Sequence, residues 1–242
     1  MIVAQLSDIH ADGSQPPLVR LDRVLGWLKP LKPDAIIISG DLAEADHAES
    51  YRRIAERLVD FGAPFFVVPG NVDEHGSMLA TFGGRMGWTT PRPLCVAGEA
   101  GPLRLIGLDV TVGRAHHGDA APVLGWLGEQ LAADERPTLI FQHQHPFPCG
   151  IDGKDRNICL NGDKLAAVIE AAGEQVIGLT CGHVHRPLFT RFAGRQATMA
   201  PSVTRANRLR LEGRETDSLE PPGLMIHHFA DRQLVSHVVM VG

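Results

Sequence analysis

Short runs of β-branched and other apolar residues alternate with amphipathic segments through the first third of the 242-residue chain. The apolar runs are Ile2–Leu6, residues 35–38 and Phe65–Val68, and each has the length of a buried strand. Between them, residues 18–29 and 48–61 carry helix start and stop signals. This alternation predicts a βαβαβ unit, with parallel strands and right-handed crossovers.

The middle of the chain continues the pattern after a loop-rich stretch. We expect strands at Leu103–Leu108, 138–141 and 176–179, and helices at 122–133 and 161–172. Strands that alternate with helices indicate further parallel pairing.

The last third changes character. It contains four short apolar runs, at residues 187–192, 196–200, 223–229 and 233–240. Gly, Pro and charged residues separate them, so we expect antiparallel strands. Residues 204–222 are expected to form a long exposed loop or a lid. No separable second domain is indicated, and residues 1–242 are interpreted as one α/β (α+β) domain.

Polar side chains of the kinds that bind metal ions follow five of the expected strands. They are Asp8 and His10, Asp41, Asn71, His143, and the pair His183 and His185. Taken singly, Asp8 would also suit a helix cap and Asp41 a turn. Because the carboxyl ends of parallel strands share one edge of a sheet, seven such side chains at five strand ends predict one site there.

The seven side chains offer carboxylate, amide and imidazole ligands and no thiolate. This set suits Mn²⁺, Fe²⁺/Fe³⁺ or Zn²⁺, and it is too rich in histidine for a dedicated Ca²⁺ or Mg²⁺ site. Seven ligands are too many for one ion, so we expect two divalent metal ions that share a carboxylate. Two ions roughly 3.5–4 Å apart can clamp a phosphate and lower the pKa of a bridging water, whose hydroxide attacks phosphorus in line. Gly40, Gly70 and Gly182 precede ligands, where a missing side chain allows close backbone approach.

The composition of the chain indicates which binding partners and which cellular compartment to expect. The net charge of −5 gives no electrostatic case for binding long nucleic acid. No signal-like segment opens the chain, and no run approaches the roughly 18 apolar residues of a membrane span. The four cysteines lack CxxC spacing, and Cys181 is interpreted as core packing. We therefore expect a cytoplasmic protein with reduced thiols and no membrane partner.

The ordered motifs resemble those of the calcineurin-like metallophosphoesterase superfamily: Asp-x-His, Gly-Asp, Gly-Asn-His, His and Gly-His-x-His, each after a strand. The resemblance implies a four-layer αββα sandwich of two mixed β-sheets flanked by helices. It also implies that Asp8, His10 and His185 hold one metal, that Asn71, His143 and His183 hold the other, and that Asp41 bridges them.

Further segments resemble the branch of class III cyclic-nucleotide phosphodiesterases and glycerophosphodiesterases. They are residues 108–110 with 125–127, 200–203 and 219–223. This branch usually has His-His-Pro-Pro where the chain has His143-Gln144-His145-Pro146. The ligand is therefore His143 or His145, and the register with the preceding strand favours His143.

The third motif departs from the superfamily, because Val72 replaces a histidine that usually contacts the phosphate and assists the leaving group. General acid assistance is typically worth 10²–10⁴-fold, and valine cannot supply it. We expect another imidazole to do so, with His145 favoured over His75 and His116. The simpler interpretation of His75, His116 and His117 is exposed loop histidines. The predicted catalytic residues are Asp41, Asn71 and His145.

These features favour a metal-dependent phosphodiesterase acting on small phosphodiesters, with 3′,5′-cyclic nucleotides such as cAMP first and glycerophosphodiesters next. The enzymatic alternative is a phosphomonoesterase or a nuclease of the same superfamily. A binding scaffold that kept the fold and lost catalysis is a third reading, and the complete ligand set argues against it. A homo-oligomer is left open, since the apolar runs 224–229 and 234–241 suit either an interface or sheet core.

Overall fold

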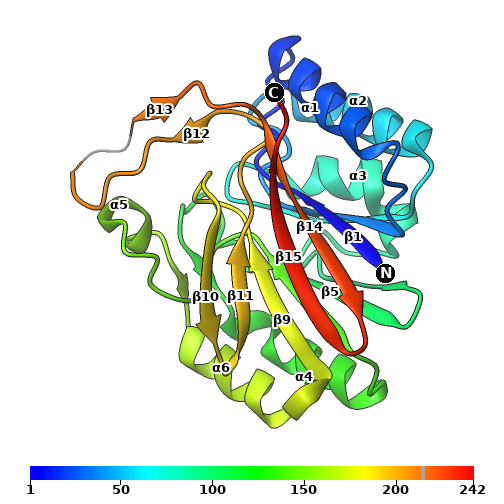
Figure 1. Cartoon of the computed structure of the whole chain (residues 1–242), viewed down its shortest axis with the longest axis vertical. Coiled ribbons are helices and arrows are strands. Elements are labelled where there is room, and N and C mark those ends of the chain that lie inside the picture. The colour runs from blue at the N-terminus through cyan, green and yellow to red at the C-terminus, as the bar shows by residue number, and fades with distance from the viewer. Residues whose placement is uncertain (214–215) are drawn as a thin grey trace.

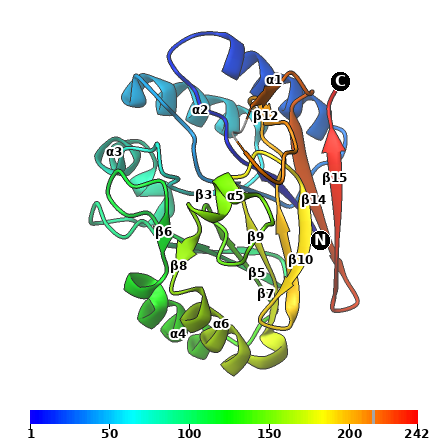
Figure 2. The same ribbon diagram turned by 90° about the vertical axis from the view of Figure 1, so that its left-hand side faces the viewer.

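Two large β-sheets face each other in the interior of the computed structural model, which describes residues 1–213 and 216–242. Helices cover the outer face of each sheet, so four layers follow one another across the molecule (Figure 1). The view turned by 90° shows α1 and α2 at one end and α4 and α6 at the other (Figure 2). The predicted four-layer αββα sandwich is confirmed.

The first sheet has the strand order β15–β14–β1–β2–β3. These strands are β1 (Ile2–Leu6), β2 (Ala35–Ser39), β3 (Phe65–Val68), β14 (Gly223–Ala230) and β15 (Gln233–Met240). The first three are parallel and are joined by α1 (Pro16–Leu28) and α2 (His47–Phe61), as the alternation predicts. Both faces of these strands are covered, which explains why they are mostly apolar rather than alternating, with Gln5 and Ser39 as buried exceptions.

The second sheet has the order β10–β11–β9–β7–β5–β4. These strands are β4 (Val96–Ala100), β5 (Leu103–Leu108), β7 (Thr138–Gln142), β9 (Val176–Cys181), β10 (Leu188–Phe192) and β11 (Arg195–Met199). The helices α4 (Leu124–Ala133) and α6 (Gly162–Ala171) pack on its outer face with a separate apolar cluster. Cys181 is fully buried in that cluster, in agreement with its interpretation as core packing.

The expectation of purely antiparallel pairing in the last third was wrong for one strand. β10 and β11 form an antiparallel hairpin, but its second strand, β11, pairs in parallel with β9. β10 is thereby left at the edge of the sheet, where Phe189 is 54% exposed. A hydrophobic pattern predicts that a hairpin exists, but it does not predict which of the two hairpin strands pairs with the neighbouring strand of the sheet.

The stretch after β3, expected to be loop-rich, contains α3 (His75–Met86). Its first turn is capped by the Glu74 carboxylate, which accepts from Gly76 N at 2.9 Å and Ser77 N at 2.6 Å. Three glycines lower the helix propensity of this segment, which obscures it in the sequence. Packing of Met78 and Phe82 into the core compensates.

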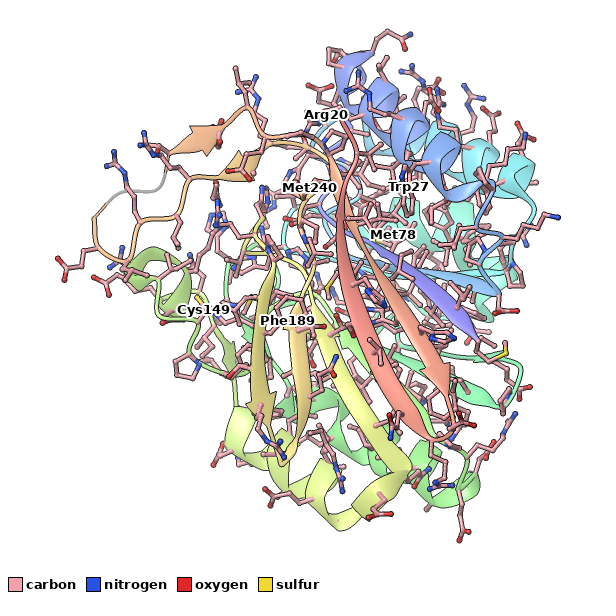
Figure 3. All side chains as sticks on the ribbon, viewed as in Figure 1. Arg20, Trp27, Met78, Cys149, Phe189 and Met240 are labelled. Atoms are coloured by element: carbon pink, nitrogen blue, oxygen red, sulfur yellow. The ribbon has the colours of Figure 1, made fainter. Side chains whose placement is uncertain are left out.

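A small hairpin projects from one side of the molecule (Figure 1). It is formed by β12 (Ala206–Asn207) and β13 (Asp217–Ser218), and we refer to residues 204–222 as the arm. Arg20 on α1 holds the base of the arm by donating to the carbonyls of Val203 at 2.8 Å, Thr204, and Glu220 at 3.0 Å (Figure 3). Farther out, Asp152 N at the start of the short helix α5 (Asp152–Asp155) donates to Leu211 O at 3.2 Å.

Candidate metal centre

The seven predicted ligands converge between the carboxyl ends of strands from both sheets. Asp8 and His10 follow β1, Asp41 follows β2, Asn71 follows β3, His143 follows β7, and His183 and His185 follow β9. Backbone hydrogen bonds connect neighbouring loops within each sheet, including Asp8 N to Gly40 O at 3.0 Å and Gly182 N to His143 O at 3.1 Å. The Asp8 carboxylate also accepts from His183 N at 3.2 Å, which ties the first motif to the last.

One group of ligand atoms comes from Asp8, His10, Asp41 and His185, and these atoms lie within 4.8 Å of one another. Nε2 of His185 is 3.1 Å from Asp8 Oδ1 and 3.2 Å from Nε2 of His10. His10 Nε2 is in turn 3.5 Å from Asp41 Oδ2. The two imidazoles therefore point their Nε2 atoms at the same carboxylate-lined space.

A second group adjoins the first through Asp41. His143 Nε2 lies 3.2 Å from Asp41 Oδ2 and 3.2 Å from Asn71 Oδ1. The same nitrogen lies 3.3 Å from His183 Nδ1. Asp41 Oδ2 thus faces both groups, and His143, not His145, is the imidazole that meets it.

These spacings suit divalent cations. With metal–ligand bonds of about 2.1 Å, neighbouring ligand atoms lie about 3.0–3.4 Å apart in tetrahedral or octahedral geometry. Most of the separations above fall in or near that range. Asp8 Oδ1 is buried and accepts no hydrogen bond from the described residues, although it faces His185 Nε2. A cation would satisfy an unpaired carboxylate oxygen in this position.

The far nitrogen of each of three imidazoles is held by an oxygen atom. His143 Nδ1 donates to Ser39 O at 2.8 Å, and His185 Nδ1 donates to Arg205 O at 2.8 Å. His10 Nδ1 lies 3.3 Å from Glu44 Oε2. Such partners orient a ligating imidazole and leave Nε2 free to bind metal.

The carboxylates and imidazoles of this buried cluster shift one another's pKa values in opposite directions. Burial alone would raise the pKa values of Asp8 and Asp41, but His185 and His143, respectively, lower them. Burial alone would lower the pKa of His143, but the carboxylates of Asp41 and Asp8 raise it to about 9. The two aspartates therefore stay ionised and require nearby positive charge, which metal ions would supply in place of the protons.

The backbone is unusual where the ligands sit. Five of the seven, namely Asp8, His10, Asp41, His183 and His185, have left-handed φ values between 48° and 71°. This conformation costs an L-residue roughly 1 kcal/mol, and such strain gathers at functional sites. Close approach by glycine accompanies it, since a Cβ on Gly70 would lie 2.2 Å from Asp41 Oδ1.

Comparison with known proteins agrees with this geometry. A model of calcineurin-like phosphoesterases matches residues 1–187. The chain belongs to the calcineurin-like phosphoesterase family. A probable glycerophosphodiester phosphodiesterase of Arcobacter nitrofigilis is 30% identical over 259 residues, which cover 100% of this chain and 94% of that protein.

One further relative agrees with this family, and one solved structure shows the same fold. A 3′,5′-cyclic adenosine monophosphate phosphodiesterase of Escherichia coli is 30% identical over 207 residues, covering 85% of this chain and 74% of that protein. A purple acid phosphatase from yellow lupin (Lupinus luteus) seeds has the same fold, with a TM-score of 0.66 at 10% identity over 100% of this chain and 51% of that one.

Among the described residues, no helix has the length and apolarity needed to cross a membrane.

Asp73 is a site residue whose role the sequence did not reveal. Its carboxylate accepts from Leu42 N at 3.0 Å and Gly70 N at 2.8 Å, and from the Tyr51 hydroxyl at 2.9 Å. These bonds join the loop after β2, which carries Asp41, to the loop after β3, which carries Asn71. The sequence shows only that Asp73 lies two residues after the proposed ligand Asn71. Its hydrogen-bond partners Leu42 and Tyr51 lie in distant segments, so the sequence could not predict its role.

His75 is not the exposed loop histidine of the simpler interpretation. It opens α3, is only 6% exposed, and lies with Nε2 3.0 Å from Asp109 Oδ2. Its other nitrogen lies 3.2 Å from Arg92 Nη2. His75 therefore fastens the start of α3 to the end of β5, and both of its nitrogens are engaged.

His145 lies behind the ligands rather than at the solvent side. It is fully buried, its ring centroid is 5.9 Å from that of His183, and its Nε2 is 3.4 Å from Asp155 Oδ1. Burial lowers the pKa of His145 to about 4. Its predicted part in proton donation stays a prediction.

Proposed function

We propose that the protein is a phosphodiesterase whose centre holds two divalent cations, Mn²⁺, Fe²⁺/Fe³⁺ or Zn²⁺. The observation that carries the proposal is the place of Asp41 Oδ2, 3.5 Å from His10 Nε2 and 3.2 Å from His143 Nε2. An oxygen facing two groups of nitrogen donors is suited to bridge two cations. Asp8, His10 and His185 would complete one position, and Asn71, His143 and His183 the other.

Cations bound there would neutralise phosphate charge and lower the pKa of a water molecule. The chain's own residues determine where this happens. His10 and His185 have side chains 14% and 16% exposed, and Asn71 is also partly exposed, whereas Asp8 and His143 are fully buried. A phosphodiester would therefore reach the centre from the side of His10, Asn71 and His185.

Two substrate classes remain in the proposal. Cyclic nucleotides such as cAMP are the first choice from the sequence, and the name of the Escherichia coli relative supports them. The glycerophosphodiester class has a specific point in its favour, because the relative of that name matches the whole chain rather than 85% of it. Both classes are small phosphodiesters that could be hydrolysed at the same centre.

The first test compares bis(p-nitrophenyl) phosphate with p-nitrophenyl phosphate, with added Mn²⁺ and then with chelator. We expect turnover of the diester that the chelator abolishes. Asp41→Ala should remove both metal and turnover. Asp60→Ala, which removes an exposed carboxylate at the end of α2, is the matched control and should retain both.

The competing functions predict different results. A preference for the monoester would replace the proposal with a phosphatase. Bound metal without turnover of either substrate would favour a binding scaffold. If the diester is hydrolysed, kcat/KM for cAMP and for glycerophosphocholine then decides between the two substrate classes.

A further inference from the structure

His116 stands at the side from which a substrate would approach the metal centre. It is exposed, and its Nδ1 lies 3.5 Å from Asn71 Nδ2. The amide nitrogen can only donate, so Nδ1 faces it as the acceptor and the ring proton lies on Nε2. No hydrogen bond from Nε2 is formed within residues 1–213 and 216–242. The imidazole therefore presents an unused N–H donor next to a proposed metal ligand.

The loop that carries His116 is held by a buried side chain next to a proposed metal ligand in the sequence. Gln144 lies between His143 and His145, is fully buried, and donates from Nε2 to His116 O at 3.3 Å. A Cβ on Gly118 would lie 3.2 Å from Gln144 Cβ, so the glycine permits this approach. The loop is further closed by a bridge between Thr111 and Gly118. His116 is thus fixed relative to Asn71 rather than free on the surface.

The other candidate imidazoles are less accessible to a bound substrate. His145 is fully buried and faces Asp155, and His75 is buried with both nitrogens engaged. A phosphoryl group held beside Asn71 would meet His116 first.

We propose that His116 is a substrate-contacting residue whose Nε2–H donates a hydrogen bond to a phosphoryl oxygen of the bound diester. The proposal rests on the proposed phosphodiesterase function. It assigns Gln144 the part of a positioning residue, because Gln144 fixes the backbone from which the imidazole projects.

Three substitutions at one position test the contact. The side-chain amide nitrogen of glutamine can take the place of the Nε2–H donor. The side-chain oxygen of asparagine can take the place of Nδ1 as the acceptor for Asn71 Nδ2, and alanine supplies neither. Affinity for inorganic phosphate is measured by calorimetry on the Mn²⁺-loaded wild type and on His116→Gln, His116→Asn and His116→Ala. Metal content and diester turnover are measured on the same samples. His117→Ala controls for disturbance of the loop.

A hydrogen bond to a charged oxygen is typically worth about tenfold or more in affinity. We expect His116→Ala and His116→Asn to lose about that much phosphate affinity, and His116→Gln to stay within about threefold of wild type, with metal content unchanged. Wild-type phosphate affinity in His116→Ala would overturn the proposal. Rescue by asparagine instead of glutamine, or loss of metal, would also overturn it, by showing that His116 only supports Asn71.

The same samples separate this inference from the proposed function. If the wild type hydrolyses the diester, and the His116 variants bind phosphate as tightly as the wild type, only the proposed His116 contact is refuted. A wild type that binds phosphate through His116 but hydrolyses no diester refutes only the phosphodiesterase.

Discussion

At the scale of single residues, the proposed metal centre depends on missing side chains as well as on its proposed ligands. A Cβ on Gly182 would lie 1.9 Å from Ser7 Oγ and 2.9 Å from Asp8 Oδ2. Both neighbours are fully buried, so they could make room for a Cβ only by displacing other packed atoms. The glycine therefore allows the loop after β9 to lie directly against the loop after β1.

We predict that Gly182→Ala separates these loops, lowers the metal content and destabilises the fold by about 1–3 kcal/mol, the usual cost of overpacking. Elemental analysis of the purified protein and urea unfolding would measure both effects. Gly128→Ala in α4 is the matched control, because a Cβ there meets nothing within 4 Å. Full metal occupancy in Gly182→Ala would contradict the argument.

The sequence predicted which ligands meet because each follows a strand and because strand order brings strand ends together. It could not predict the residues that fasten the surrounding helices, strands and loops to one another. His75 and Asp109 are 34 residues apart, and no local pattern marks them as a pair. Asp73 acts through backbone N–H groups, which every sequence has. Such roles depend on tertiary distances that only the folded chain defines.

At the scale of elements, α3 shows how a side chain can start a helix that propensity does not favour. Its cap is Glu74, outside the Ser, Thr, Asp and Asn group that usually marks a helix start. The hydrogen bonds to Ser77 and Gly76 lower the pKa of Glu74 to about 2. The strands β1, β2 and β3 were predictable because β-branched runs mark them, whereas α3 carries neither a standard cap nor a strong propensity.

We predict that Glu74→Ala lowers the free energy of unfolding by about 1 kcal/mol at neutral pH, because α3 loses its N-cap. The folded pKa lies below the unfolded value of about 4.3, so this contribution is present above that pH and is lost as the pH falls toward 2. Urea unfolding at pH 7 and pH 3 would show the difference from wild type shrinking in acid. Glu170→Ala, at an exposed position of α6, should change stability by less than about 0.5 kcal/mol at both values.

At the scale of the whole molecule, a buried polar network joins the two sheets. Gln5 on β1 donates to Ser39 Oγ at 2.8 Å and accepts from Thr180 Oγ1 of β9 at 2.6 Å. His227 on β14 donates from Nε2 to Gln5 Oε1 at 3.0 Å and accepts at Nδ1 from Ser236 Oγ at 2.8 Å. Because buried polar groups are costly when unpaired, this network favours a single alignment of the sheets. That alignment sets the distance between the proposed ligands that follow β1 and those that follow β9.

This network makes stability depend on pH through a residue that binds no metal. Burial lowers the pKa of His227 to about 4, against about 6.5 in an unfolded chain. The folded protein favours the neutral ring. The contribution of His227 to the free energy of unfolding is therefore complete above about pH 6.5, and it falls by on the order of 3 kcal/mol as the pH falls toward 4.

We predict that His227→Gln, which cannot titrate, is less stable than wild type at pH 7.5 and that this difference in the free energy of unfolding narrows by pH 5. Urea unfolding in the presence of chelator measures the difference, in which the titration of the ligand histidines cancels because both proteins contain them. His228→Gln, at the neighbouring exposed position, is the control for the substitution itself and should change the free energy of unfolding at pH 7.5 by less than about 0.5 kcal/mol. A deficit of constant size from pH 7.5 to pH 5 would show that His227 does not resist protonation in the folded protein.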